Sequence, residues 1–208
     1  MATKTIGIAG LLVLALAVGL LALLGGDDET KATETDGAFV AEMVPHHESA
    51  IEMAEVALKR AEHPEIRDLA QNIIATQSDE IGTLEMIHQR LFGEPVGAGD
   101  HGTLGLPPDQ MGMEMDAATL ATADPFDREF IDMMIPHHQG AIRMAYVELE
   151  NGGDDEAMAL AETIIDAQAA EIEDMSAWRA DWYGAPSPAG GVPDVGDTAA
   201  PSHEEMGH

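Results

Sequence analysis

The stretch FVAEMVPHHESAIEMAEVAL occupies residues 39–58, and a second copy, FIDMMIPHHQGAIRMAYVEL, occupies residues 130–149. The two stretches match at 11 of 20 positions without a gap, and the offset of 91 holds as far as residues 81 and 172. Chance similarity between apolar helices rarely keeps Met, Pro and His-His in register, so the chain contains an internal duplication. Each copy should therefore form the same structural unit.

Each copy predicts two helices. Apolar residues recur at helical spacing in both stretches. A further helix begins near Pro64, because the first turn of a helix tolerates proline, and Gly93 ends it. In the second copy the sequence NGG at 151–153 ends one helix, and the next runs from about Asp154 to Tyr183. The fold class is therefore all-α: a ferritin-like four-helix bundle made of two duplicated helical hairpins.

The N-terminal segment predicts a transmembrane helix that precedes the bundle. An uncharged run extends from Ile6 to Leu24, close to the roughly 20 residues that cross a bilayer. Lys4 precedes the run and acidic residues follow it, which places the rest of the chain outside the cytoplasm. The expected location is the cell membrane, with a single pass and the bundle facing the periplasm or the cell exterior. A cleaved signal peptide is the alternative, and it would leave a secreted protein.

The duplication and the composition divide the chain into parts. The expected parts are a membrane anchor or signal segment at 1–25, a polar linker at 26–36, the bundle at 37–184, and a disordered tail containing His and Met at 185–208. Within the bundle we expect repeat one at 37–92, a crossover rich in Gly and Met at 93–125, and repeat two at 126–184.

Composition limits the partners and the chemistry. The 208 residues carry a formal net charge of −30, which argues against nucleic acid or anionic lipid as a partner and is compatible with cations or a saline habitat. The sequence has no cysteine, which excludes disulfides, thiolate metal sites and a cysteine nucleophile. Any site for a soft metal must therefore use Met and His.

The duplicated stretches supply such residues at helical spacing. Met43 and His47 lie one turn apart, as do Met134 and His138, and Met133 with His137 adds another pair in repeat two. Pro45 and Pro136 suggest a kink or a helix start just before each His pair. The expected metal ligands are Met43, His46, His47, Met53, Met133, Met134, His137, His138 and Met144.

Polar residues interrupt the apolar stripes of the partner helices at equivalent points. A buried polar group costs about 1–3 kcal/mol unless it is hydrogen-bonded, and the His rings are its natural partners. We therefore expect these residues to orient the imidazoles, in a metal site or in a purely structural network. The residues are Gln77, Glu80, Gln168 and Glu171.

The crossover carries methionines that have no evident core to fill. Met111, Met113 and Met115 alternate along a Gly-rich segment and could capture metal. Thioether and imidazole ligands favour copper, Cu(I) more than Cu(II), and would also accept another soft metal such as silver.

The function expected from these residues is that of an exported, membrane-anchored protein that binds copper for envelope buffering, transfer or tolerance, with a metal-exchange protein as a candidate partner. A metal-free scaffold or interaction module, held together by a structural His network, is the alternative. The di-iron pattern of Glu and Glu-x-x-His is absent at both His pairs, and no substrate pocket is evident, so we expect no enzymatic activity. A copper-dependent oxidase would be the enzymatic alternative.

The phrases FIDMMIPHHQGAIRMA and AETIIDAQAAEIEDM, with their shorter copies in repeat one, resemble the bacterial family called domain of unknown function 305 over roughly residues 36–184. The resemblance implies an exported, ferritin-like helical bundle, and some members bind copper through His and Met and take part in copper tolerance. By position, the family's His and Met residues correspond to Met43, His46, His47, Met53, Met134, His137, His138 and Met144. Repeat one departs from the pattern, with Glu48 and Ser49 where repeat two has Gln139 and Gly140, so its site is expected to be weaker or purely structural.

Overall fold

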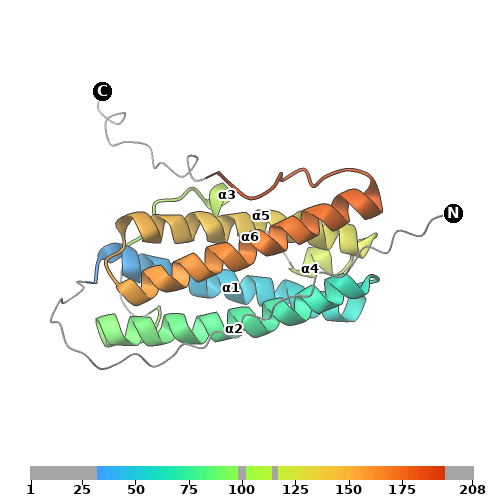
Figure 1. Cartoon of the computed structure of the whole chain (residues 1–208). Helices are drawn as coiled ribbons and strands as arrows, with labels where there is room; N and C mark the ends of the chain where they lie inside the picture. Colours follow the sequence, from blue (N-terminus) through green and yellow to red (C-terminus); the bar gives the residue numbers. More distant parts are fainter. Residues whose placement is uncertain (1–31, 98–101, 114–116, 195–208) are drawn as a thin grey trace.

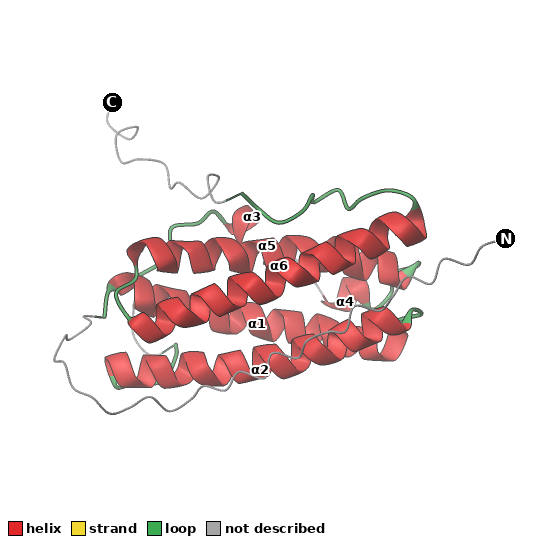
Figure 2. Cartoon of the chain, viewed as in Figure 1, coloured by secondary structure: helices red, strands yellow, loops and turns green. Residues whose placement is uncertain are grey.

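The computed structural model describes residues 32–97, 102–113 and 117–194. Within these ranges, four long helices form a bundle, and two short helices lie in the crossover (Figures 1 and 2). The long helices are α1 (Glu34–Arg60), α2 (Pro64–Phe92), α5 (Phe126–Asn151) and α6 (Asp155–Tyr183). The short ones are α3 (Pro108–Met111) and α4 (Ala117–Leu120). No strand occurs in the described ranges, so the all-α prediction is confirmed.

Local chemistry sets the ends of the helices. Thr33 caps α1 in a reciprocal arrangement with Asp36, and Pro64 opens α2. Gly93 ends α2 in the left-handed conformation, with a φ of 73° that favours glycine. The side chain of Asp154 accepts the amide hydrogen of Ala157 at the start of α6. The boundaries predicted for the second and fourth long helices are confirmed.

The prolines lie inside helices rather than at helix starts. Pro45 belongs to α1 and Pro136 to α5, and both helices continue on either side of them. The alternative that each His pair begins a helix is therefore wrong. Tertiary packing holds these helices together despite the backbone hydrogen bond that each proline removes.

The four long helices pair in chain order. α1 packs against α2 and α5 against α6, and the two hairpins then join mainly along α1 and α5 (Figure 1). Asp127 at the start of α5 accepts the amide hydrogens of Glu62 and His63, just beyond the end of α1. At the other end, Asp36 in α1 accepts those of Gly153 and Asp154, beyond α5. α1 and α5 therefore run antiparallel, with their middles side by side.

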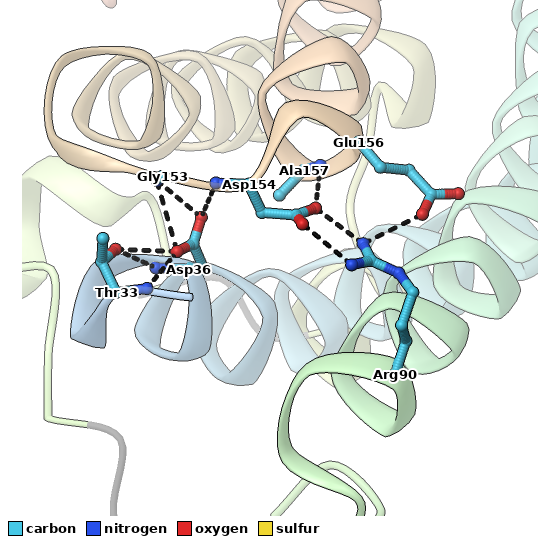
Figure 3. Close-up of polar contacts among 7 residues, drawn as sticks. All are labelled: Thr33, Asp36, Arg90, Gly153, Asp154, Glu156 and Ala157. Atoms are coloured by element: carbon cyan, nitrogen blue, oxygen red, sulfur yellow. Dashed lines mark hydrogen bonds and ion pairs between the residues drawn. The ribbon is translucent and has the colours of Figure 1, made fainter. Parts of the chain in front are cut away.

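A polar network closes one end of the bundle (Figure 3). The buried Asp36 carboxylate accepts the amide hydrogens of Gly153 at 3.0 Å and Asp154 at 2.9 Å, and the Thr33 hydroxyl at 2.8 Å. The Arg90 guanidinium donates to both carboxylate oxygens of Asp154, at 2.9 and 2.7 Å. The network thus ties the start of α1 and the end of α2 to the start of α6.

The hydrophobic core consists of two buried clusters. The first cluster contains Met53, Phe130 and Met134, and the second contains Met43, Leu84 and Met144. Each cluster therefore draws on both repeats, and each contains methionines from both α1 and α5. The four adjacent histidines of the duplicated stretches are buried as well, although they belong to neither hydrophobic cluster.

Three predicted parts of the chain lie at or beyond the limits of the described residues. In the described ranges no helix is both long enough and apolar enough to cross a membrane, and the anchor expected at 1–25 lies outside them. α1 begins at Glu34, inside the range expected to be a linker. Gln139 bonds to the carbonyls of Ala189 and Gly191, so residues 185–194 of the tail are held against the bundle.

Candidate metal centre

Four histidines cross the middle of the bundle. His46 and His47 come from α1, His137 and His138 come from α5, and all four are 0% exposed. The ring centroids are 6.3 Å apart within each helix, and those of His46 and His137 are 3.9 Å apart between the helices. The order of the rings is therefore His47, His46, His137, His138, with the closest approach where the two repeats meet.

The outer two rings are each anchored by a carboxylate. His47 Nε2 lies 2.9 Å from Glu80 Oε2 in α2, and His138 Nε2 lies 2.6 Å from Glu171 Oε2 in α6. A carboxylate accepts, so Nε2–H of each ring donates to it, and in the neutral form of the ring the lone pair is on Nδ1. Neither Nδ1 has a hydrogen-bond partner among the described residues. Each hairpin thus fixes one imidazole in a metal-binding tautomer.

His46 has the same tautomer for a different reason. Its Nε2 lies 2.9 Å from the backbone carbonyl oxygen of Met111 in α3. A carbonyl only accepts, so His46 donates Nε2–H, and its Nδ1 lone pair also lacks a partner in the described part of the chain. The crossover therefore takes part in the His layer through its backbone.

His137 is the least satisfied of the four rings. Neither its Nδ1 nor its Nε2 makes a well-aligned hydrogen bond within the described ranges, and the His46 backbone nearby offsets only a little of the effect of burial on its pKa. Burial, together with the neighbouring His46, lowers the pKa of His137 well below its usual value. Burial and the neighbouring His47 lower the pKa of His46 to about 3. Both central rings are therefore neutral, the form that binds metal.

The glutamines are buried but are not hydrogen-bonded like the glutamates. Gln77 and Gln168 are each 3% exposed and lie three residues before Glu80 and Glu171, on the same faces of α2 and α6. Gln77 Oε1 and both polar atoms of the Gln168 amide lack partners in the described part. Of the four residues expected to orient the imidazoles, only the glutamates hydrogen-bond to His rings.

The methionines are brought together across the two repeats. Met43 belongs to the same buried cluster as Met144, and Met53 belongs to the same cluster as Met133 and Met134. Helical spacing alone placed Met53 and Met144 too far along their own helices to join the nearby His pairs. Because α1 and α5 are antiparallel, Met53 instead lies in the cluster of Met134, which precedes His138 by one turn. Met144 likewise lies in the cluster of Met43, which precedes His47 by one turn. All five are at most 8% exposed.

The predicted capture methionines have different environments. Met111 is half-buried at the end of α3, Met113 is 38% exposed, and Met115 lies outside the described residues. α3 packs on α5 at Gly140, where a Cβ atom would lie 1.9 Å from the Met111 carbonyl oxygen. In the sequence, Gly140 stands where repeat one has Ser49, but that difference did not predict this close contact. The available signal was that one helical position is glycine in repeat two and serine in repeat one.

The donor set determines what this layer could bind. Among the described residues, no group of three or more His, Cys, Asp or Glu side chains has the geometry to hold a metal ion. Lone pairs on buried imidazole nitrogens, with thioethers in the adjoining clusters, remain as donors. These donors suit a soft ion such as Cu(I), which accepts low coordination numbers and sulfur ligands, and they do not suit a hard cation.

Comparison with known proteins gives matches of family and of structure. The family model described as domain of unknown function (DUF305) matches residues 36–206. Solved structures of CopM in Cu(I)-bound, Cu(II)-bound and Ag-bound forms are 44% identical to this chain, with TM-scores of 0.63, 0.64 and 0.62. They cover 72%, 71% and 72% of this chain and 98%, 97% and 97% of their own.

A DUF305 fragment from Deinococcus radiodurans is 30% identical, covers 73% of this chain and 99% of its own, and has a TM-score of 0.62. No curated protein matches this sequence.

Proposed function

We propose that this chain, which belongs to the DUF305 family, binds copper through His and Met side chains in the middle of its bundle. The proposed ion is Cu(I) rather than Cu(II). The solved structures of its relative CopM contain Cu(I), Cu(II) or Ag, which supports copper as the ion and silver as a substitute. The preference for Cu(I) comes from the donors: thioether sulfur and neutral imidazole.

One observation carries the proposal: buried imidazole nitrogens with free lone pairs. His46, His47 and His138 commit Nε2–H to oxygen acceptors, and their Nδ1 atoms have no partner in the described residues. Each buried acceptor without a partner costs about 1–3 kcal/mol. A bound soft cation would recover that cost, whereas a purely structural network would be expected to satisfy both nitrogens of each ring.

The ligands we propose form two related groups. In one, His47 and Met43 bind the ion with help from Met144. In the other, His138 and Met134 do so with help from Met53, and His137 and Met133 contribute from the same helix. Glu80 and Glu171 orient the outer rings by accepting Nε2–H, which also makes the ring a stronger electron donor.

The wider role follows from the rest of the chain. We propose that the N-terminal segment anchors the protein in the cell membrane with the bundle outside the cytoplasm, or is cleaved to release it. There the bundle buffers or passes on copper, and Met111, Met113 and Met115 in the crossover capture the ion before it enters. The proposal includes exchange with another copper protein and no catalytic step.

A competition titration tests the proposal. The full-length chain, without oxygen and with a reductant, is titrated against Cu(I) held by a coloured chelator, and the copper bound per chain is measured. We expect the unaltered chain to withdraw Cu(I), and His47→Gln with His138→Gln to lose most of that capacity. His63→Gln is the control, because His63 lies beyond the end of α1 and stacks on Trp182, away from the His layer.

The scaffold alternative rests on the hydrogen bonds from the His rings to Glu80, Glu171 and the Met111 carbonyl, which also stabilise the bundle. If the unaltered chain withdraws no Cu(I), and the histidine variants differ from it only in a lower melting temperature, the scaffold role replaces the copper role.

A further inference from the structure

The crossover docks on the His layer from outside. The short helix α3 lies over α5 (Figure 1), and the carbonyl of its last residue, Met111, accepts Nε2–H of His46 at 2.9 Å. This hydrogen bond joins a surface segment to a ring that is 0% exposed.

Two glycines allow the backbone of the crossover to pack directly against the backbone of α5. A Cβ atom at Gly140 in α5 would lie 1.9 Å from the Met111 carbonyl oxygen and 2.3 Å from its carbonyl carbon. A Cβ atom at Gly112 would lie 2.4 Å from the Pro136 carbonyl oxygen and 2.8 Å from the His137 Cα. Gly112 also has a φ of 69°, which favours glycine. Neither position admits a side chain while α3 remains in place.

The docking surface belongs to repeat two only. Besides Gly140, Arg143 in α5 donates to the Gln110 carbonyl at 3.2 Å. The equivalent residues of repeat one are Ser49 and Glu52, which carry a side chain and the opposite charge. The two repeats have thus diverged at the positions that hold α3, while the buried histidines are identical.

We propose that α3 is a displaceable cap over the His46–His137 pair, and that its opening sets the rate at which a soft monovalent metal ion enters the layer of four histidines. The metal part rests on the proposed function, whereas the capping of His46 does not. A four-residue helix is marginal by itself, so its position depends on its contacts with the bundle. Besides the contacts above, these are the packing of Leu104, Leu106 and Met111 against the second core cluster and the Leu104 amide hydrogen donated to Glu42. Opening releases Nε2–H of His46 and uncovers the place where the two repeats meet.

Glycine-to-alanine variants provide a matched test. Gly140→Ala and Gly112→Ala each place a methyl group in the contact, from opposite sides of it. Gly82→Ala, in α2, and Gly105→Ala, with a φ of 74°, are the controls, because a Cβ atom at either meets nothing within 4 Å. Alanine favours helix more than glycine does, so Gly140→Ala should displace α3 without unfolding α5.

The first measurement needs no metal. Full-length chains are treated with diethyl pyrocarbonate, which modifies neutral imidazole, and the modification of His46 and His137 is followed by mass spectrometry. We expect both rings to react about tenfold faster in the two cap variants than in the unaltered chain. A rate change of this size is expected when a local segment loses one or two of the contacts that hold it closed. The control variants should react like the unaltered chain. Equal protection in all chains would overturn the cap.

The second measurement is the rate of Cu(I) uptake from the chelator. We expect uptake and release both to be faster in Gly140→Ala and Gly112→Ala, with the affinity nearly unchanged, because the cap controls access and not the ligands. Unchanged rates together with faster histidine modification would overturn the role of the cap in metal entry. If no chain takes up Cu(I), the proposed function fails, and the modification rates still decide whether α3 covers His46.

Discussion

His46 and His137 occupy equivalent positions in the two repeats, and their rings lie 3.9 Å apart between centroids, tilted by 42°, at the centre of the bundle. Each ring is 0% exposed and, by the direction of its pKa, neutral. At its centre, the contact between the duplicated hairpins is therefore built of imidazole rather than hydrocarbon. A fold that needed only stability would gain more from apolar residues there.

Replacing His137 should not destabilise the metal-free protein. Its two ring nitrogens are buried without partners in the described residues, so His137→Leu removes two unsatisfied polar atoms and should leave the free energy of unfolding unchanged or higher. His47→Leu is the contrast, because it leaves the buried Glu80 carboxylate without its partner and should cost about 1–3 kcal/mol. Urea unfolding of the metal-free chains measures both. An equal loss in the two variants would mean that His137 is hydrogen-bonded in the native protein.

Methionine variants should separate sulfur chemistry from packing. Leu and Met have similar volumes, so Met43→Leu and Met134→Leu should change the free energy of unfolding by less than about 1.5 kcal/mol. Each removes a proposed thioether ligand, and we expect Cu(I) affinity to fall about tenfold, measured by chelator competition. Met175→Leu is the packing control: Met175 is equally buried in the same cluster as Met134, but the residue one turn later is Arg179 rather than His. A similar loss of affinity in all three would assign the effect to packing.

Stability should depend on pH through a carboxyl pair at the end of the bundle. Burial, with the adjacent Asp36, raises the pKa of Glu148 from 4.5 to about 9. Burial alone would raise the pKa of Asp36 as well, but hydrogen bonds from Thr33 and Gly153, together with the adjacent Glu148 side chain, lower it. The native state thus keeps a proton on Glu148 that the unfolded chain releases above pH 4.5.

The contribution of Glu148 to stability is therefore full below pH 4.5 and is lost as pH rises through about 9. Glu148→Gln keeps the neutral form at every pH and should be more stable than the unaltered chain at high pH. Urea unfolding at about pH 5 and about pH 9 measures the difference. Glu150→Gln, at an exposed position two residues away, should change neither value. Parallel pH profiles for the two variants would contradict the assignment.

Two side chains hold the segment that follows α6: Arg179 donates to the Ala185 carbonyl at 3.0 Å, and Gln139 holds the residues beyond it. The Gln139 amide donates to the carbonyls of Ala189 and Gly191, at 2.9 and 2.6 Å. Gln139→Ala should release residues 189–194 and raise their rates of amide hydrogen exchange and of proteolysis, with little change in the melting temperature. Glu48→Ala is the matched control, because Glu48 is the exposed equivalent in repeat one. Unchanged protection of 189–194 would show that other contacts hold this part of the segment.

The sequence alone determined the helices and the identity of the unusual residues. Helical periodicity together with Pro64, Gly93 and the NGG at 151–153 gave the helix limits, because these signals act over one or two turns. The duplication gave the equivalence of the His pairs, because a gap-free offset needs no spatial information. The pairing of buried polar groups with His rings was also readable, because a core cannot leave a carboxylate without a partner.

Only the tertiary structure decided which residues meet. The antiparallel arrangement of α1 and α5 placed His46 against His137 and put Met53 in the cluster of Met134, a partner from the other repeat. It also decided that the glutamates, rather than Gln77 and Gln168, bond to the rings. The close packing of the crossover backbone against Gly140 was likewise decided by the tertiary structure. These contacts join residues far apart in the chain, so they depend on how whole helices pack, and no local pattern records that packing.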